Sequence, residues 1–167
     1  MPRGIAVNRR ASGYHEQRLD QLALADRIAS FLLAVNWSWR RSPQSVTQKL
    51  IQMDCVAVAV LDNEWLIASN SQGLTDYDVE LAAEELGQIT YAIVTRGTPN
   101  AMHAEMQVLE EIRASGYTGD QIKQLGLYMG VSKPCCRTCA EWLSFYNIGY
   151  AGWHDSPVVN WEEPDMS

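Results

Sequence analysis

The sequence predicts a single α/β domain, because segments with the pattern of strands alternate along the chain with segments that have the pattern of helices. Short apolar runs bounded by turn residues mark the strands, and apolar residues three and four positions apart mark the helices. The chain has 167 residues, an ordinary length for one domain. Hydrophobic residues make up 47% of it and charged residues 20%, which excludes disordered and fibrous classes.

The first 41 residues are expected to form a basic N-terminal extension that contains one helix. Residues 15–36 carry apolar side chains at steps of three and four, the spacing of an amphipathic helix. Seven arginines against three acidic residues give residues 1–41 a charge of +4, whereas six basic and seventeen acidic residues give residues 42–167 a charge of −11. Such an extension either contacts a phosphate backbone or is an ordinary solvated helix face.

A core is predicted over residues 50–161, and it begins with a β-hairpin. Cys55 to Leu61 has the composition of a buried strand, the next three residues form a tight turn, and residues 65–69 supply the antiparallel partner. A helix over residues 75–86 and a β-rich segment over 89–95 are expected next. A cluster of glycine, proline and asparagine at 97–100 ends this part of the chain.

Two more helices and three more strands complete the predicted core. Helices are expected at 101–114 and 136–147, and strands at 125–131, 150–154 and 158–161. Only three residues separate the last two strands. This length permits only an antiparallel return, because a parallel crossover needs a dozen residues or more.

Residues capable of metal chemistry gather at the beginnings of these two helices. His103-Ala104-Glu105 opens the first helix, and Pro134-Cys135-Cys136-Arg137-Thr138-Cys139 opens the second. One imidazole and two thiolates can hold a zinc ion and leave its fourth position to water. A cysteine in the first turn of a helix is favoured as the thiolate, the form that binds zinc. Three cysteines so close together cannot staple distant parts of a fold, so we expect metal binding in a reducing compartment.

Periodicity alone leaves the first cysteine ligand open. Cys136 and Cys139 lie three residues apart, and Cys135 and Cys139 lie four apart, so either pair would share a helix face. Two intervening residues are the commoner spacing in zinc sites, which favours Cys136 with Cys139. Glu105 lies two residues from His103, a spacing that does not by itself show that the two side chains cooperate.

As a pair, the two motifs resemble the signature of the zinc-dependent nucleobase deaminase (cytidine deaminase-like) superfamily. The resemblance implies a three-layer α-β-α fold with a mixed central sheet of about five strands and an antiparallel final hairpin. It also implies a zinc ion held by His103, Cys136 and Cys139, with Glu105 as the catalytic proton carrier. The doubled cysteine departs from the family pattern, in which proline directly precedes the first ligand. Within the superfamily, the motifs are most similar to the bacterial toxin-type and nucleic-acid deaminases.

The same resemblance implies which residues meet the substrate and which reaction takes place. Asn70, Ala104, Trp153 and His154 are expected to contact it, although Asn70 also suits a turn and Trp153 also suits the core. The implied reaction converts cytosine to uracil in single-stranded nucleic acid. Two alternatives stay open: a deaminase of free nucleosides, nucleotides or related small bases, and a non-catalytic zinc module whose metal is closed by a fourth ligand.

The sequence also predicts a cytoplasmic protein without a membrane partner. The longest apolar stretch is far too short to span a bilayer, and the N-terminus lacks the apolar core of a signal peptide. Neither composition nor motifs predict the oligomeric state.

Overall fold

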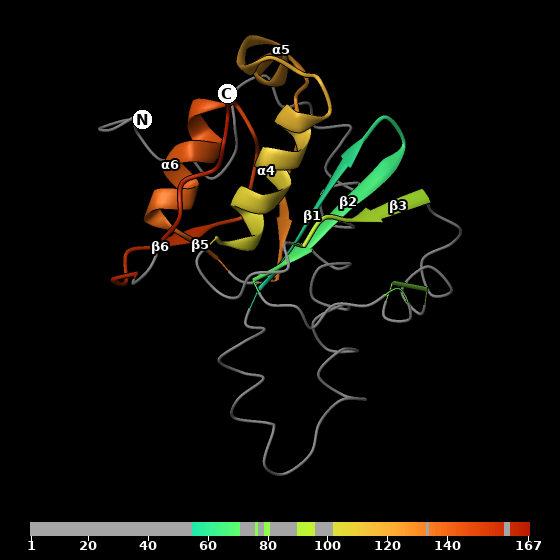
Figure 1. Ribbon diagram of the computed structural model, residues 1–167. Coiled ribbons are helices and arrows are strands. Elements are labelled where there is room, and N and C mark those ends of the chain that lie inside the picture. Colours follow the sequence, from blue (N-terminus) through green and yellow to red (C-terminus); the bar gives the residue numbers. More distant parts are fainter. Residues whose placement is uncertain are drawn as a thin grey trace.

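The computed structural model describes residues 55–70, 76, 79–80, 90–95, 102–132, 134–158 and 161–167. The predicted basic extension over 1–41 and its helix lie outside these residues. The described part is a mixed α/β fold, in which no helix has the length and apolar character needed to cross a membrane (Figure 1). Its elements are β1 (Val56–Leu61), β2 (Glu64–Ser69), β3 (Thr90–Ile93), α4 (Ala104–Ala114), α5 (Gly119–Gln124), β4 (Gly130–Val131), β5 (Cys135–Cys136), α6 (Arg137–Phe145) and β6 (Trp153–His154).

The main sheet has four strands in the order β3-β2-β1-β4. Strand β1 pairs antiparallel with both β2 and β4, whereas β3 pairs in parallel with β2, so the sheet is mixed as predicted. About five strands were expected. The described residues do not form a continuous fifth strand. Instead, Gly149 forms a parallel bridge with Tyr128, and further along the chain β6 pairs in parallel with β5 over two residues.

The hairpin between β1 and β2 forms as predicted, except that its turn has two residues instead of three, because Glu64 belongs to β2. Its register pairs Val56 with Ser69 at one end and Leu61 with Glu64 at the other. Asp62 and Asn63 form the two-residue turn with φ angles of 50° and 63°. Two left-handed residues make a type I′ turn, whose twist matches that of the flanking strands, and Asp and Asn tolerate this conformation better than other non-glycine residues.

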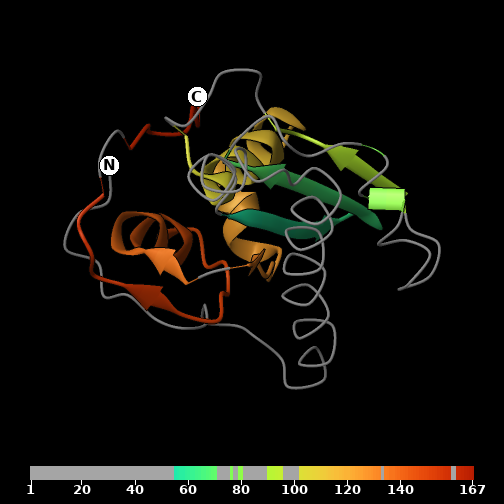
Figure 2. The same ribbon diagram turned by 90° about the horizontal axis from the view of Figure 1, so that it is seen from below.

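Both faces of the sheet are buried around β1 and β2. One face packs against α4, which lies over these two strands in both views (Figure 2). The opposite face is buried as well, as expected for a sheet covered on both sides and for a three-layer fold. The side chains that alternate onto that opposite face are Val56, Val58, Trp65 and Ile67.

The two helices of the predicted metal site begin later than the sequence pattern indicated. Helix α4 starts at Ala104 with His103 as its N-cap, and α6 starts at Arg137 with Cys136 as its N-cap. Helix α5 was not predicted. Its signal is a capping box, in which Thr118 accepts from the main chain of Gln121 and the Gln121 side chain accepts from Thr118 in return.

The predicted antiparallel final hairpin is not formed by the described residues. Strand β6 pairs in parallel with β5, and neither Val158 nor Trp161 belongs to a strand; residues 159–160 lie outside the described part. The reason lies in the packing of the chain end. The Trp161 ring lies against Trp142 of α6, with 6.1 Å between ring centroids, so the apolar residue expected in a strand covers a helix instead.

The hairpin turn provides a test of the fold. Replacing Asn63 by valine should lower the free energy of unfolding by about 1–2 kcal/mol, because a β-branched side chain clashes with the main chain at positive φ. The matched change of Asn63 to glycine should be neutral or stabilising. Urea unfolding followed by circular dichroism measures both, and equal stability of the two variants would contradict the turn geometry.

Candidate metal centre

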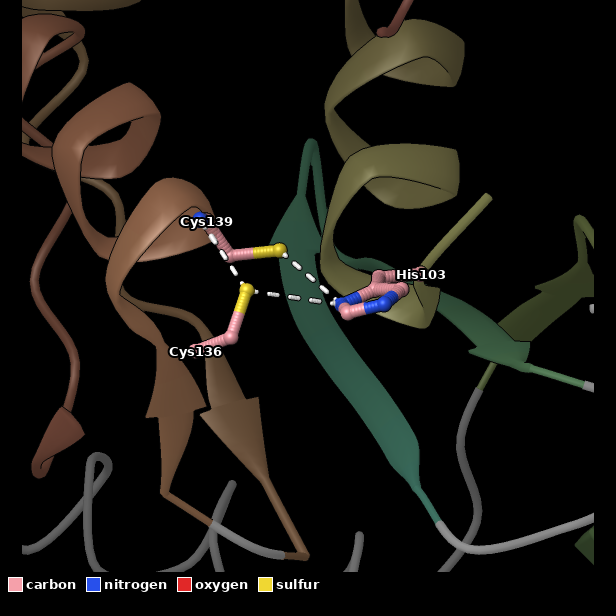
Figure 3. A group of neighbouring side chains, drawn as sticks. All are labelled: His103, Cys136 and Cys139. Atoms are coloured by element: carbon pink, nitrogen blue, oxygen red, sulfur yellow. Dashed lines mark hydrogen bonds between the residues drawn. The ribbon is translucent and has the colours of Figure 1, made fainter. Parts of the chain in front are cut away.

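The structure brings His103, Cys136 and Cys139 together from two helix starts (Figure 3). Nδ1 of His103 lies 3.6 Å from Sγ of Cys136 and 3.4 Å from Sγ of Cys139. All three potential ligand atoms lie within 4.8 Å of one another. Cys136 and Cys139 are both buried, and His103 is partly exposed. These side chains, one from the N-cap of α4 and two from the start of α6, form a group that could bind a metal ion.

The donor set and its spacing fit zinc. Tetrahedral zinc with bonds of about 2.0 Å to nitrogen and about 2.3 Å to sulfur requires nitrogen–sulfur separations of about 3.5 Å. The two separations in the structure agree with this value. Two sulfurs and one imidazole nitrogen are also ligands that zinc prefers in proteins. Three protein ligands leave one of the four tetrahedral positions to water or substrate.

The surroundings of Cys136 favour its thiolate. Its sulfur caps α6 by accepting a hydrogen bond from the main-chain N–H of Cys139, at 3.4 Å. Hydrogen bonding from the Cys139 thiol, opposed by burial and assisted by His103, lowers the pKa of Cys136 to about 4. Burial raises the pKa of Cys139. The hydrogen bond of the Cys139 thiol to the Cys136 sulfur raises it further, so the proton stays on Cys139. A metal ion between the two sulfurs would replace this shared proton.

The main chain around His103 fixes the position of its ring at the start of α4. The His103 side chain does not cap α4, while its carbonyl accepts hydrogen bonds from the N–H groups of Met106 and Gln107. The buried Gln107 side chain donates to the carbonyls of Ser69, at 2.8 Å, and Met102, at 3.0 Å. These bonds fasten the start of α4 to the end of β2, and so fix the place from which the imidazole reaches the cysteines.

Cys135 faces a different partner, although it adjoins Cys136. Its buried thiol lies close enough to the Glu105 carboxyl group for each to shift the pKa of the other. Burial, followed by the negative charge of Glu105, raises the pKa of Cys135 well above its usual range and so keeps it a thiol. Cys135 is not part of the metal-binding group. The metal-binding group therefore contains the sulfurs of Cys136 and Cys139, whereas the Cys135 thiol interacts with the Glu105 carboxyl group.

Glu105 is buried beside this group, with only 2% of its surface exposed. Burial raises the pKa of its carboxyl group, which is also close enough to His103 and Cys136 for their charges to act on it. One carboxylate oxygen, Oε2, is buried without a hydrogen-bond partner. A buried polar atom without a partner is costly, and such atoms occur where a substrate, water or ion completes the site.

Two of the expected substrate contacts have structural roles in the described residues. Oδ1 of Asn70 accepts from the main-chain N–H of Cys55, at 3.4 Å, and the main-chain N–H of Asn70 donates to the Cys55 carbonyl. Asn70 therefore closes the open end of the hairpin, as a turn residue would. The Ala104 side chain is fully buried in the core, so only its main chain could reach a substrate.

Trp153 and His154 lie next to the metal group, because β6 pairs with β5. The register places Trp153 beside Cys135 and His154 beside Cys136. Trp153 is half-buried against the core, and His154 is exposed. Sequence reasoning missed Arg137, whose guanidinium lies 5.2 Å from the centre of the Trp153 ring. The signal in the sequence that could have indicated Arg137 is its position directly after Cys136.

A cavity of about 560 Å³ lies at the other end of α4. It is lined by the hairpin turn and by the loop that follows α4, including Asp62, Ser115 and Tyr117. None of its lining residues belongs to the metal-binding group. The chemistry at the helix starts is therefore separate from this cavity.

Substitution of the adjacent cysteines distinguishes their roles. Cys136→Ser should lose bound zinc, because it removes a sulfur ligand. Cys135→Ser should keep about one zinc per chain, because Cys135 is not part of the metal-binding group. Zinc content after purification and dialysis measures both. Zinc retained in the first variant and lost in the second would make Cys135 the ligand.

The segment that contains both motifs is similar to a known protein family. Residues 102–165, which contain both motifs, match the model of the OTT_1508-like deaminase family. No curated protein and no solved structure matches the chain. The match covers the His103 and Cys136–Cys139 segments together, and it supports a deaminase function for the site that they form.

Proposed function

We propose that this protein is a zinc-dependent hydrolytic deaminase that converts cytosine to uracil in single-stranded nucleic acid. One observation carries the proposal: the buried Glu105, with an unpartnered carboxylate oxygen, adjoins a group of one imidazole and two thiols that fits zinc. The match of this segment to a deaminase family supports the same reaction class. In this assignment His103, Cys136 and Cys139 hold the metal, and Glu105 is the catalytic residue.

The reaction replaces the exocyclic amine of cytosine with an oxygen from water and releases ammonia. Bound zinc would lower the pKa of a coordinated water towards neutrality. Glu105 would accept the proton of the attacking water at its unpartnered oxygen. The carboxyl group would then pass this proton to the ring nitrogen, and would carry the second proton of the water, from the newly added hydroxyl group, to the departing amine. Its raised pKa suits it to hold a proton between these transfers.

The proposed substrate surface is the β5–β6 edge beside the metal. Trp153 offers an aromatic face for base stacking, and His154 and Arg137 offer donors for phosphate or base oxygens. The Ala104 main chain at the start of α4 and the Asn70 amide at the hairpin end complete the proposed contacts. Arg137 is half exposed and forms an ion pair with Glu141, at 3.1 Å, which orients the guanidinium beside Trp153.

A single strand suits such an edge better than a duplex. A paired base would have to leave the stack at a cost of a few kcal/mol before it reached Glu105. An edge that combines a partly exposed aromatic ring with cationic side chains is also the arrangement by which proteins bind unpaired bases and their phosphates. This substrate agrees with the nucleic-acid and toxin-type branch that the motifs resemble.

A closed structural zinc site would need a fourth protein ligand. Within the described residues, the metal-binding group contains three side chains. The two candidates for a fourth are less suited to this role: burial and the charge of Glu105 raise the pKa of Cys135 and keep it a thiol, and Nδ1 of His154 accepts from the N–H of Ser156. These contacts favour an open catalytic site over a non-catalytic module.

The Glu105→Gln variant tests the catalytic assignment. It should reduce deamination by at least about a hundredfold while zinc stays bound, because the amide cannot carry the proton. Glu111→Gln, on the same helix and away from the metal group, is the matched control and should retain activity. Ammonia release and cytosine-to-uracil conversion are measured together with zinc content. Full activity of Glu105→Gln would remove this residue from the mechanism.

The same assay identifies the substrate when single-stranded DNA, duplex DNA, RNA, cytidine and deoxycytidine are compared. Conversion of a single-stranded polymer, and not of monomers, is the expected result. Conversion of the monomers alone would make this protein an enzyme of free nucleosides or nucleotides. No conversion of any substrate by the zinc-loaded protein would contradict the cytosine assignment.

Arg137 tests the contact with nucleic acid. If its guanidinium binds a phosphate, Arg137→Gln should reduce the salt dependence of single-strand binding by about 0.7 in the slope of log K against log salt. Lys123→Gln removes the same charge from α5 and should leave this slope unchanged. Fluorescence anisotropy with a labelled oligonucleotide over a series of salt concentrations gives both slopes. Equal slopes for the two variants would show that Arg137 makes no phosphate contact.

A further inference from the structure

The chain end contacts a metal ligand directly. Nε1 of Trp161 donates a hydrogen bond to Sγ of Cys139, at 3.3 Å. The rest of the indole packs against Trp142, with an angle of 35° between the ring planes. Cys139 is fully buried, so the indole N–H is a donor to a sulfur that is shielded from water.

The residues after Trp161 are fastened to the other helix of the site. The N–H of Asp165 donates to a carboxylate oxygen of Glu110, at 2.8 Å. Nε of Arg113 donates to the carbonyl of Met166, at 3.1 Å. Pro164, directly before Asp165, is buried. The C-terminal segment, residues 161–167, therefore contacts α6 at one end and α4 at the other, and in Figure 1 it runs along α6.

We propose that Trp161 is a positioning residue of the metal centre, whose indole N–H holds the Cys139 thiolate in place and reduces the charge that it donates to the metal. This inference rests on the metal site of the proposed function, and it adds a residue outside the two recognised motifs. The C-terminal segment places the donor, because its far end is bound to α4 through Glu110 and Arg113.

A donor to a metal-bound thiolate acts in two ways. It fixes the direction of the sulfur, and it withdraws part of the negative charge that would otherwise neutralise the metal. Both effects are large where water cannot supply the bond instead, as at the buried Cys139. Loss of such an outer partner typically costs 10–100-fold in metal affinity.

The neighbouring indole gives a matched control. Trp142 is in the same ring pair and is buried, but its Nε1 has no hydrogen-bond partner. Trp161→Phe and Trp142→Phe therefore make the same chemical change in the same aromatic cluster. Only the first removes a hydrogen bond to the sulfur.

Zinc affinity of the two variants, measured by competition with a coloured chelator, tests the proposal. Trp161→Phe should bind zinc at least about tenfold more weakly than the wild type, and Trp142→Phe should stay within about threefold of it. Circular dichroism of the metal-free forms shows whether each variant is folded. Equal affinities in two folded variants would overturn the proposal.

A measurement on the unmutated chain covers the case in which Trp161→Phe fails to fold. In the cadmium-loaded protein, the indole proton of Trp161 should show a scalar coupling to the cadmium nucleus through the hydrogen bond. Absence of this coupling would overturn the proposal, while metal binding and deamination would still support the proposed function. A chain that binds neither zinc nor cadmium would overturn both the proposal and the metal site.

Discussion

Two helix starts that face each other are the constraint on which the site depends. His103 is the N-cap of α4, and Cys136 is the N-cap of α6. An N-cap residue has extended backbone, so its side chain leaves the helix end instead of lying along a helix face. Both ligands therefore project into the gap between the two helices, where Cys139 of the first turn of α6 joins them. The β2 end fixes α4 through Gln107, and the β5–β6 pair fixes α6.

The electrostatics of this arrangement require negative ligands. Each helix start carries a partial positive charge, which disfavours a bare cation and favours thiolates and carboxylates. Two thiolates would balance the charge of a divalent zinc ion, and Glu105, in the first turn of α4, adds one negative charge near the same helix end. Such a balance would let a divalent metal ion share one small volume with two buried thiols and a buried carboxyl group. Burial and the nearby charge of Glu105 raise the pKa of Cys135, so this thiol stays neutral beside the metal-binding group.

The sequence predicted local features well and long-range contacts poorly. The β1–β2 hairpin and the two helices of the site follow from periodicity and turn residues, because these signals are local. The choice between Cys135 and Cys136 could not follow from spacing, since it depends on where α6 begins and on the position of Glu105. The prediction of a final antiparallel hairpin was wrong for the described residues, because Trp161 packs on α6, and no turn rule predicts this contact. The proposed role of Glu105 follows from the family resemblance of the paired motifs and not from their spacing.

The central claim is that a metal ion is held by three protein ligands with one position open beside Glu105. X-ray absorption spectroscopy at the zinc edge, on the zinc-loaded full chain, tests it most directly. The account predicts one zinc ion with two sulfur neighbours at about 2.3 Å and two nitrogen or oxygen neighbours at about 2.0 Å. Three or more sulfur neighbours would contradict it, because Cys135 would then have closed the site.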